Sequence, residues 1–199
     1  MKKIRNYFER VMMTAILAVV CGSFLTACGS DDDDNGGNGG SASGGGTNAA
    51  IFIGEKNYGN APYGYFLDNG IDGTERTGSF MFSNVKLPDG LTSLDTKWTY
   101  VSVRLPYDGG AIPVGKFSGS DVDMDFDINH NLKDNTVDLT GWSVNVSIEI
   151  KKSGDKYVID VTASNLYTAT DYSSAGKKSS DNFTFHYEGG LTMLVNSQQ

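Results

Sequence analysis

From residue 51 onward, apolar and polar side chains alternate with a period of two, and no segment has the 3.6-residue period of an amphipathic helix. Such alternation places neighbouring side chains on opposite faces of a β-strand. The longest example, 142–163, contains a Ser-Gly-Asp turn and therefore predicts a β-hairpin. We expect its buried face to consist of Trp142, Val144, Val146, Ile148, Ile150, Tyr157, Ile159 and Val161.

Shorter alternating segments fill most of the remaining chain, and turns containing Gly, Asp or Pro separate them. Uneven segment lengths and two long connections, 129–136 and 167–181, favour an all-β antiparallel β-sandwich of about seven to nine strands for the single domain 51–199. A calycin-like antiparallel β-barrel is the alternative. Further predicted core residues are Val122, Met124, Phe126, Ile128, Phe183, Phe185 and Tyr187.

Residues 1–27 have the layout of an export signal. Basic residues come first, an apolar run follows from 11 to 20, and small residues precede Cys28. The run is shorter than the about 20 residues that a membrane-spanning helix needs. The sequence LTAC ending at Cys28 resembles the lipobox of bacterial lipoproteins, in which the cysteine receives a lipid and becomes the mature N-terminus. The alternative is an ordinary signal peptide with an incidental cysteine.

An acidic run lies directly behind that cysteine, and its residues are Ser30, Asp31, Asp32, Asp33 and Asp34. Like charges in a row stay solvated, so the simplest interpretation is a spacer. In this position the run resembles the surface-export signal of lipoproteins in Bacteroidota. That resemblance implies a protein anchored in the outer membrane by its N-terminal lipid and exposed on the cell surface. The rest of 28–50 is rich in glycine and predicts a flexible tether with a root-mean-square span of roughly 25 Å.

The C-terminal part of the domain carries a second resemblance. Within 112–192, the segments IPVGKF, GWSVNVSIEIKKSGDKYVIDVTA and FTFHYEGGLT are similar to a pattern that recurs in small β-rich lipoproteins of Bacteroidota. Many members of that group have no assigned activity. The resemblance therefore supports the fold and the cellular address, and it implies no particular chemistry.

Charge and cysteine content narrow the choice of partners. Removing 1–27 takes four basic residues and one acidic residue from a chain with 16 Lys plus Arg and 24 Asp plus Glu, so the formal charge changes from −8 to −11. This balance argues against nucleic acid or anionic lipid as a partner. The other cysteine, Cys21, lies in the removed segment, so a chain lipidated at Cys28 keeps no free thiol and no disulfide.

The sequence gives little support for catalysis. His130 and His186 are the only histidines, and there is no Gly-x-Ser-x-Gly turn, no His-x-x-x-His pair and no phosphate-binding glycine loop. We therefore expect no enzymatic activity and no cofactor. A hydrolase is kept as the weakest alternative.

Four aspartates alternate with the apolar residues of 121–128, and we expect them to form a solvated outer face. A calcium loop is the less favoured interpretation of the segment that begins at the last of them. Leu132 lies where the calcium-loop pattern needs glycine, and Asp replaces the usual final Glu. The calcium ligands at positions 1, 3, 5 and 12 of this pattern would be Asp127, Asn129, Asn131 and Asp138.

The segment 98–105 offers the most specific binding hypothesis. If Thr99 and the following alternate residues form its core face, Trp98 and Tyr100 lie on the opposite face with Arg104. Two exposed rings could stack on sugar rings while Arg104 binds hydroxyl groups. The alternative is a central strand with both faces buried. We therefore expect a non-catalytic binding module with glycan as its candidate ligand, and the alternative is a structural or adhesive component of the cell envelope with a protein partner.

Surface display can be tested directly in cells. Replacing Asp31 to Asp34 by alanine is expected to leave the protein in the membrane fraction but to protect it from protease added outside intact cells. Cys28→Ala is the companion variant, and it is expected to lose labelling by a fatty acid and to leave the membrane fraction. If external protease cleaves the alanine variant as fully as the wild type, the acidic run is only a spacer and not an export signal.

Overall fold

The computed structural model describes residues 49–72, 74–87, 96–173 and 176–194, so the predicted signal segment, Cys28 and the acidic run lie outside the described residues. Within these ranges no helix is long and apolar enough to cross a membrane. The strands are β1 (Ala50–Ile53), β2 (Lys56–Asn60), β3 (Tyr63–Asp72), β4 (Glu75–Ser83), β5 (Lys97–Pro106), β6 (Gly115–Ser118), β7 (Asp123–Asn131), β8 (Leu139–Ser143), β9 (Asn145–Ser153), β10 (Lys156–Ser164), β11 (Tyr167–Ala169), β12 (Lys177–Lys178), β13 (Phe183–Gly189) and β14 (Leu191–Leu194).

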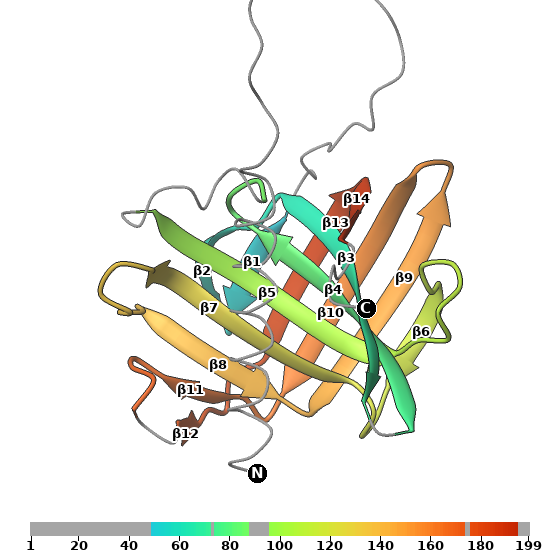
Figure 1. Cartoon of the computed structure of the whole chain (residues 1–199). Coiled ribbons are helices and arrows are strands. Elements are labelled where there is room, and N and C mark those ends of the chain that lie inside the picture. The colour runs from blue at the N-terminus through green and yellow to red at the C-terminus, as the bar shows by residue number, and fades with distance from the viewer. Residues whose placement is uncertain (1–48, 73, 88–95, 174–175, 195–199) are drawn as a thin grey trace, which may run out of the picture. The chain divides into compact units, whose positions relative to one another are not determined.

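These strands form two sheets that pack face to face (Figure 1). One sheet has the order β2-β1-β13-β10-β9-β6, and the other has the order β12-β11-β8-β7-β5-β4-β3-β14. Neighbouring strands are antiparallel except for β14, which runs parallel to β3. The predicted all-β sandwich is therefore confirmed. The barrel alternative is wrong, because the described strands belong to two separate sheets.

Each sheet joins the beginning of the domain to its end. In the six-stranded sheet, β1 pairs with β13 and places Ile51 opposite Phe185. In the eight-stranded sheet, β14 pairs with β3 and places Leu191 opposite Gly64. Ala50 is the first residue of β1, and Ala49 before it is also tied to the fold. The carbonyl of Ala49 accepts a hydrogen bond of 2.8 Å from the amide of Ala61. The folded domain thus begins slightly before the predicted boundary at residue 51.

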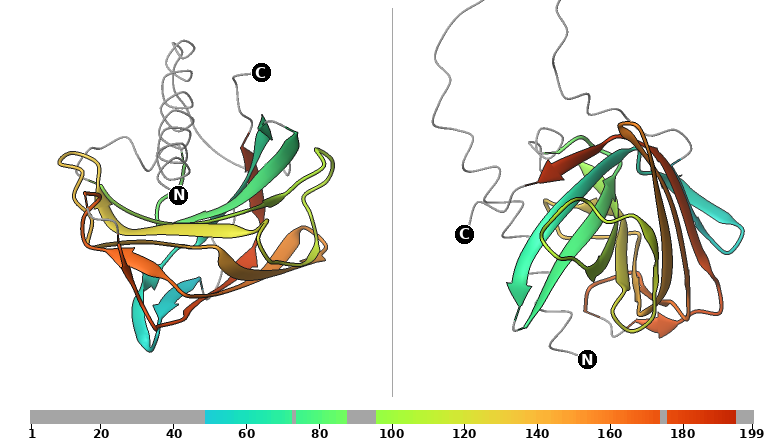
Figure 2. Two further views of the ribbon diagram at one scale, coloured as in Figure 1. Left: turned by 90° about the horizontal axis from the view of Figure 1, so that it is seen from below. Right: turned by 90° about the vertical axis from the view of Figure 1, so that its right-hand side faces the viewer.

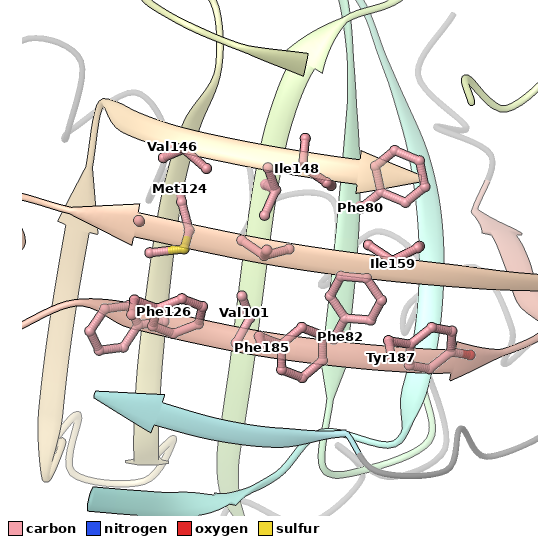
Figure 3. Close-up of a cluster of buried hydrophobic side chains, with 14 of the residues drawn as sticks. Phe80, Phe82, Val101, Met124, Phe126, Val146, Ile148, Ile159, Phe185 and Tyr187 are labelled. Carbon is pink, nitrogen blue, oxygen red and sulfur yellow. The ribbon is translucent and has the colours of Figure 1, made fainter. Parts of the chain in front are cut away.

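Aromatic side chains fill the space between the two sheets (Figure 3). Phe82 of β4 packs on two rings of β13, with ring centroids 4.7 Å from Phe185 and 4.9 Å from Tyr187. Phe126 of β7 stacks on Phe183 with centroids 5.4 Å apart. Burying such side chains is the main favourable term in folding. The predicted core residues confirmed as buried are Val122, Met124, Phe126, Ile128, Val146, Ile148, Ile150, Tyr157, Ile159, Val161, Phe183, Phe185 and Tyr187.

The predicted buried face of 142–163 is wrong at its first two positions. The chain leaves the eight-stranded sheet after β8 and enters the six-stranded sheet at β9, so the alternation changes phase at Val144, whose side chain is 58% exposed. Ser143 marks the crossing, because its hydroxyl donates to the carbonyl of Ser164 at 2.8 Å. Trp142 consequently lies on the outer face of the eight-stranded sheet. Such breaks and several very short edge strands raise the number of strands to fourteen in the described part, against the seven to nine expected.

Some strand glycines leave room for aromatic rings. A Cβ atom on Gly141 would lie 2.4 Å from Cζ of Phe126 and 3.1 Å from the carbonyl oxygen of Tyr167. A Cβ atom on Gly78 would likewise lie 2.4 Å from Cζ of Phe66. Strand interiors normally disfavour glycine, and close approach of another group is one reason to keep it. The absence of a side chain at 141 is therefore part of the core packing.

We expect Gly141→Ala to destabilise the fold, because the added methyl group overlaps the ring of Phe126. Overpacking of this kind costs about 1–3 kcal/mol, and the melting temperature falls by roughly 2–4 °C per kcal/mol at this chain length. Thermal unfolding of both proteins measures the change. Gly110→Ala is the control, because its Cβ would meet only the side chain of the exposed Asp108, at 3.2 Å. Equal melting temperatures for the two variants would contradict the proposed packing.

Candidate functional site

The outer face of the eight-stranded sheet, turned away from the core, collects most of the candidate residues. Figure 2 shows that this sheet is curved, with the outer face on the inside of the curve. Strand register arranges the side chains in rows, because directly opposed residues on neighbouring strands share a face. The middle row contains Met81, Ser102, Asp125, Trp142 and Tyr167, and the row beside it contains Ser83, Tyr100, Asp127 and Thr140.

The hypothesis of two exposed rings is wrong for Trp98, and the alternative of a strand with both faces buried holds there. Its side chain is only 5% exposed, its Nε1 donates to Oγ of Ser83 at 2.8 Å, and its ring lies 4.6 Å from that of Tyr100. The reason is the position of β5, which lies between β4 and β7 in the middle of the sheet. Tyr100 and Arg104 do lie on the outer face, and both are half-buried.

The aspartates of β7 do not form a solvated face. Asp127 is buried and Asp125 is half-buried. The hydroxyl of Tyr100 donates to Oδ2 of Asp125 at 2.9 Å, and the hydroxyl of Tyr172 donates to Oδ2 of Asp127 at 2.6 Å. Tyr172 follows β11 in the chain, within the predicted connection 167–181. We call Asp125 and Asp127, with the side chains around them on the outer face, the carboxylate site.

Arg104 and His130 are the basic groups in contact with these strand aspartates. The guanidinium of Arg104 pairs with the carboxylate of Asp123, with its Nε at 3.1 Å from Oδ2. Nε2 of the buried His130 donates to Oδ1 of Asn135 at 3.0 Å. Nδ1 of His130 lies 3.7 Å from Oδ2 of Asp127, which is beyond hydrogen-bond distance.

Burial raises the pKa of Asp125 well above its usual range, and the negative charges of Asp127 and Asp123 raise it further. The hydrogen bond from Tyr100 opposes this shift. Burial also raises the pKa of Asp127 and of Asp123. Burial, followed by the charge of Asp125, raises the pKa of Tyr100 well above its usual value. The site therefore disfavours negative charge, although it is built from carboxyl groups.

Two buried polar atoms of this face have no hydrogen-bond partner among the described residues. They are Oγ of Ser102, whose residue is fully buried, and Nδ1 of His130. Ser102 lies directly opposite Asp125 in the middle row. Buried polar groups are nearly always paired, so such exceptions call for a specific explanation.

A stacked aromatic pair lies beside the carboxylates. The rings of Trp142 and Tyr167 are 4.4 Å apart with an angle of 9° between their planes, and both side chains are half-buried. Trp142 is directly opposite Asp125 across β8 and β7. The sequence interpretation missed this pair because it assigned Trp142 to the core. A core-facing Gly141, with Trp142 pointing outward, was the alternative phase of the same alternation.

The four residues of the calcium pattern are not gathered into one site. β7 continues through Asn131, so the segment is a strand where a calcium loop would be needed. Asn129 donates through Nδ2 to Asp138 at 2.8 Å, whereas Asp127 binds Tyr172 on the outer face. In the part of the chain that the structure describes, no group of three or more His, Cys, Asp or Glu residues could hold a metal ion.

His186 lies on the six-stranded sheet, where its Nδ1 is 2.7 Å from Oδ1 of Asp160. It is therefore on a different sheet from His130.

No protein-family model, curated protein or solved structure matches the chain. The carboxylate site is accordingly interpreted from its own geometry, which combines flat aromatic surfaces, carboxyl oxygens and unpaired buried polar atoms.

We expect Asp125→Asn to stabilise the protein near neutral pH. Burial raises the folded-state pKa above the about 3.9 of an unfolded chain, so the folded state holds the proton more tightly than the unfolded state does. The free energy of unfolding of the wild type therefore falls as the pH rises from about 4 through the raised pKa. Asparagine does not titrate, and its oxygen can still accept the hydrogen bond from Tyr100.

Urea unfolding at about pH 4 and about pH 7 measures this effect. The stability gained by Asp125→Asn should be largest at the higher pH and should shrink toward the lower one. Asp121→Asn is the control, because that side chain is exposed and its substitution should change stability by less than about 0.5 kcal/mol. A loss of stability of the same size at both pH values would contradict the raised folded-state pKa of Asp125.

Proposed function

We propose that this protein is a non-catalytic, glycan-binding lipoprotein of the outer membrane, displayed at the cell surface, and that the carboxylate site is where the glycan binds. The observation that carries the proposal is the half-buried Trp142–Tyr167 stack directly beside Asp125. Sugar rings have apolar C–H faces that pack on flat aromatic rings. Their hydroxyl groups donate to carboxylates such as those of Asp125 and Asp127.

The shape and polarity of the outer face support the same function. The face lies on the inside of the curve of the sheet (Figure 2), so residues from several strands can contact one extended ligand. Binding sites for small ligands combine apolar walls with a few polar groups that fix orientation. Here the stacked pair provides apolar surface, whereas Tyr100, Asp125 and Arg104 provide donors and acceptors from neighbouring strands.

The cellular address supports an extracellular ligand. The lipobox at Cys28 and the acidic run behind it imply a lipid anchor on the outer face of the outer membrane, and the glycine-rich tether would let the domain turn toward its ligand. A structural component with a protein partner has less support. The large apolar side chains exposed among the described residues are distributed over separate elements, and they are Phe52, Ile71, Val114, Val144 and Met193.

A glycan array tests the proposal. We expect the full-length chain, purified in a detergent without a sugar head group, to bind at least one glycan, and Trp142→Ala to weaken that binding about thirtyfold or more. This factor corresponds to the roughly 2 kcal/mol of an aromatic hot spot. Isothermal titration of the array hit measures the affinity.

Tyr58→Ala provides the control, because it removes a half-buried ring from β2 in the other sheet and should leave the affinity unchanged. Trp142→Phe keeps a flat ring and should retain part of the affinity. If the wild type binds no glycan, or if Trp142→Ala binds as tightly as the wild type, the proposed function is wrong.

A further inference from the structure

The carboxylate site is rich in acid groups and poor in positive charge. Three aspartates of β7 lie on this face, and the guanidinium of Arg104 pairs with the outermost one, Asp123. The side-chain partner of Asp125 is the neutral hydroxyl of Tyr100. Asp127 receives the hydroxyl of Tyr172, and the only imidazole near it stands 3.7 Å away. Within the described chain, the hydrogen-bond donors to Asp125 and Asp127 are neutral hydroxyl groups, and the ion-pair contact of these carboxylates is that of Asp127 with His130, which carries a charge only when its imidazole is protonated.

A carboxylate held away from water needs a positive partner, because burial penalises the ionised form. Two neighbouring carboxylates add mutual repulsion to that penalty. The raised pKa values of Asp125 and Asp127 are consistent with an incomplete charge balance at the site. A ligand that brings a cation between them would remove both penalties at once.

The unpartnered Oγ of Ser102 gives an independent indication of a missing ligand group. Its residue is fully buried, and it lies directly across from Asp125 on the neighbouring strand. Nδ1 of His130 is likewise buried without a hydrogen-bond partner, 3.7 Å from Oδ2 of Asp127. An ammonium group has three donors and no acceptor, so it matches a set of carboxylate, hydroxyl and imidazole acceptors better than a single hydroxyl does.

We infer that the ligand of the carboxylate site is an amino sugar whose nitrogen is a free, positively charged amine. This inference rests on the proposed glycan binding and specifies its chemical class. The aromatic rings of Tyr100, Trp142 and Tyr172 border the same carboxylates, and ring faces attract ammonium groups. An organic cation fits better than a metal ion, since no group of three or more His, Cys, Asp or Glu residues in the described ranges is arranged to hold one.

A matched pair of oligosaccharides tests the inference. One is a β-linked tetrasaccharide of glucosamine, and the other is the same tetrasaccharide with every nitrogen acetylated. Titration of the full-length chain is carried out in a detergent without a sugar head group, at a pH below the pKa of the amine. We expect the amine form to bind at least about tenfold more tightly, and its binding to weaken as salt is added.

Variants then test whether the preference for the amine form depends on Asp125 and Asp127. Asp125→Asn and Asp127→Asn each remove a carboxylate charge with little change of shape, and each should bring the ratio of the two affinities toward one. Asp121→Asn lies outside the site on an exposed residue and should leave the ratio unchanged. Circular dichroism checks that the variants are folded. Two independent aspartate variants keep the test valid if one of them fails to fold.

The outcomes separate this inference from the proposed function. If the acetylated form binds as tightly as the amine form, the amino-sugar inference is overturned while glycan binding stands. The inference also falls if the preference for the amine survives both aspartate variants, or if only other glycans of the array bind. If no glycan binds at all, the proposed function and the inference fail together.

Discussion

The contact of Phe82 with Phe185 and Tyr187 is the interaction on which the rest of the structure depends. It joins β4 in one sheet to β13 in the other, and thereby sets which alternate residues of β4 face the core. Since the side-chain period of a strand is two, Met81 and Ser83 must then face outward. The residues paired with them across β5, β7 and β8 face outward as well, because opposed residues share a face of the sheet. The carboxylate site is in this sense a consequence of the packing on the opposite face.

The sequence was sufficient to predict much of the core but not the phase of every strand. Alternation correctly identified the inward residues of β7, β9, β10 and β13, because each of these strands stays in one sheet. It failed at Trp142 and Val144, where the chain passes from one sheet to the other. A pattern of apolar and polar letters does not record such a crossing, because Trp142 and Val144 fall in the same phase of GWSV although neither faces the core.

The carboxylate site was harder to predict for a different reason. Aspartates that alternate with apolar residues normally indicate a solvated face, yet here the central position of β7 and contacts from distant residues bury Asp127 and half-bury Asp123 and Asp125. Tyr172, which binds Asp127, is 45 residues away along the chain. The glycan platform at 98–105 required an exposed Trp98, and the structure instead has the buried alternative, with β5 between two strands. Contacts of this kind depend on the topology of the sheets, so the pattern of nearby residues in the sequence does not predict them.

The pairing of strands from opposite ends of the domain has a consequence for the order of folding. β1 needs β13, and β3 needs β14, so neither sheet can be completed until the last strands of the domain are available. Contacts between residues far apart in sequence slow folding, because a long loop must close before they form. A chain of this topology cannot complete either sheet before its last strands have been synthesised, which is compatible with the export of an extended polypeptide proposed above.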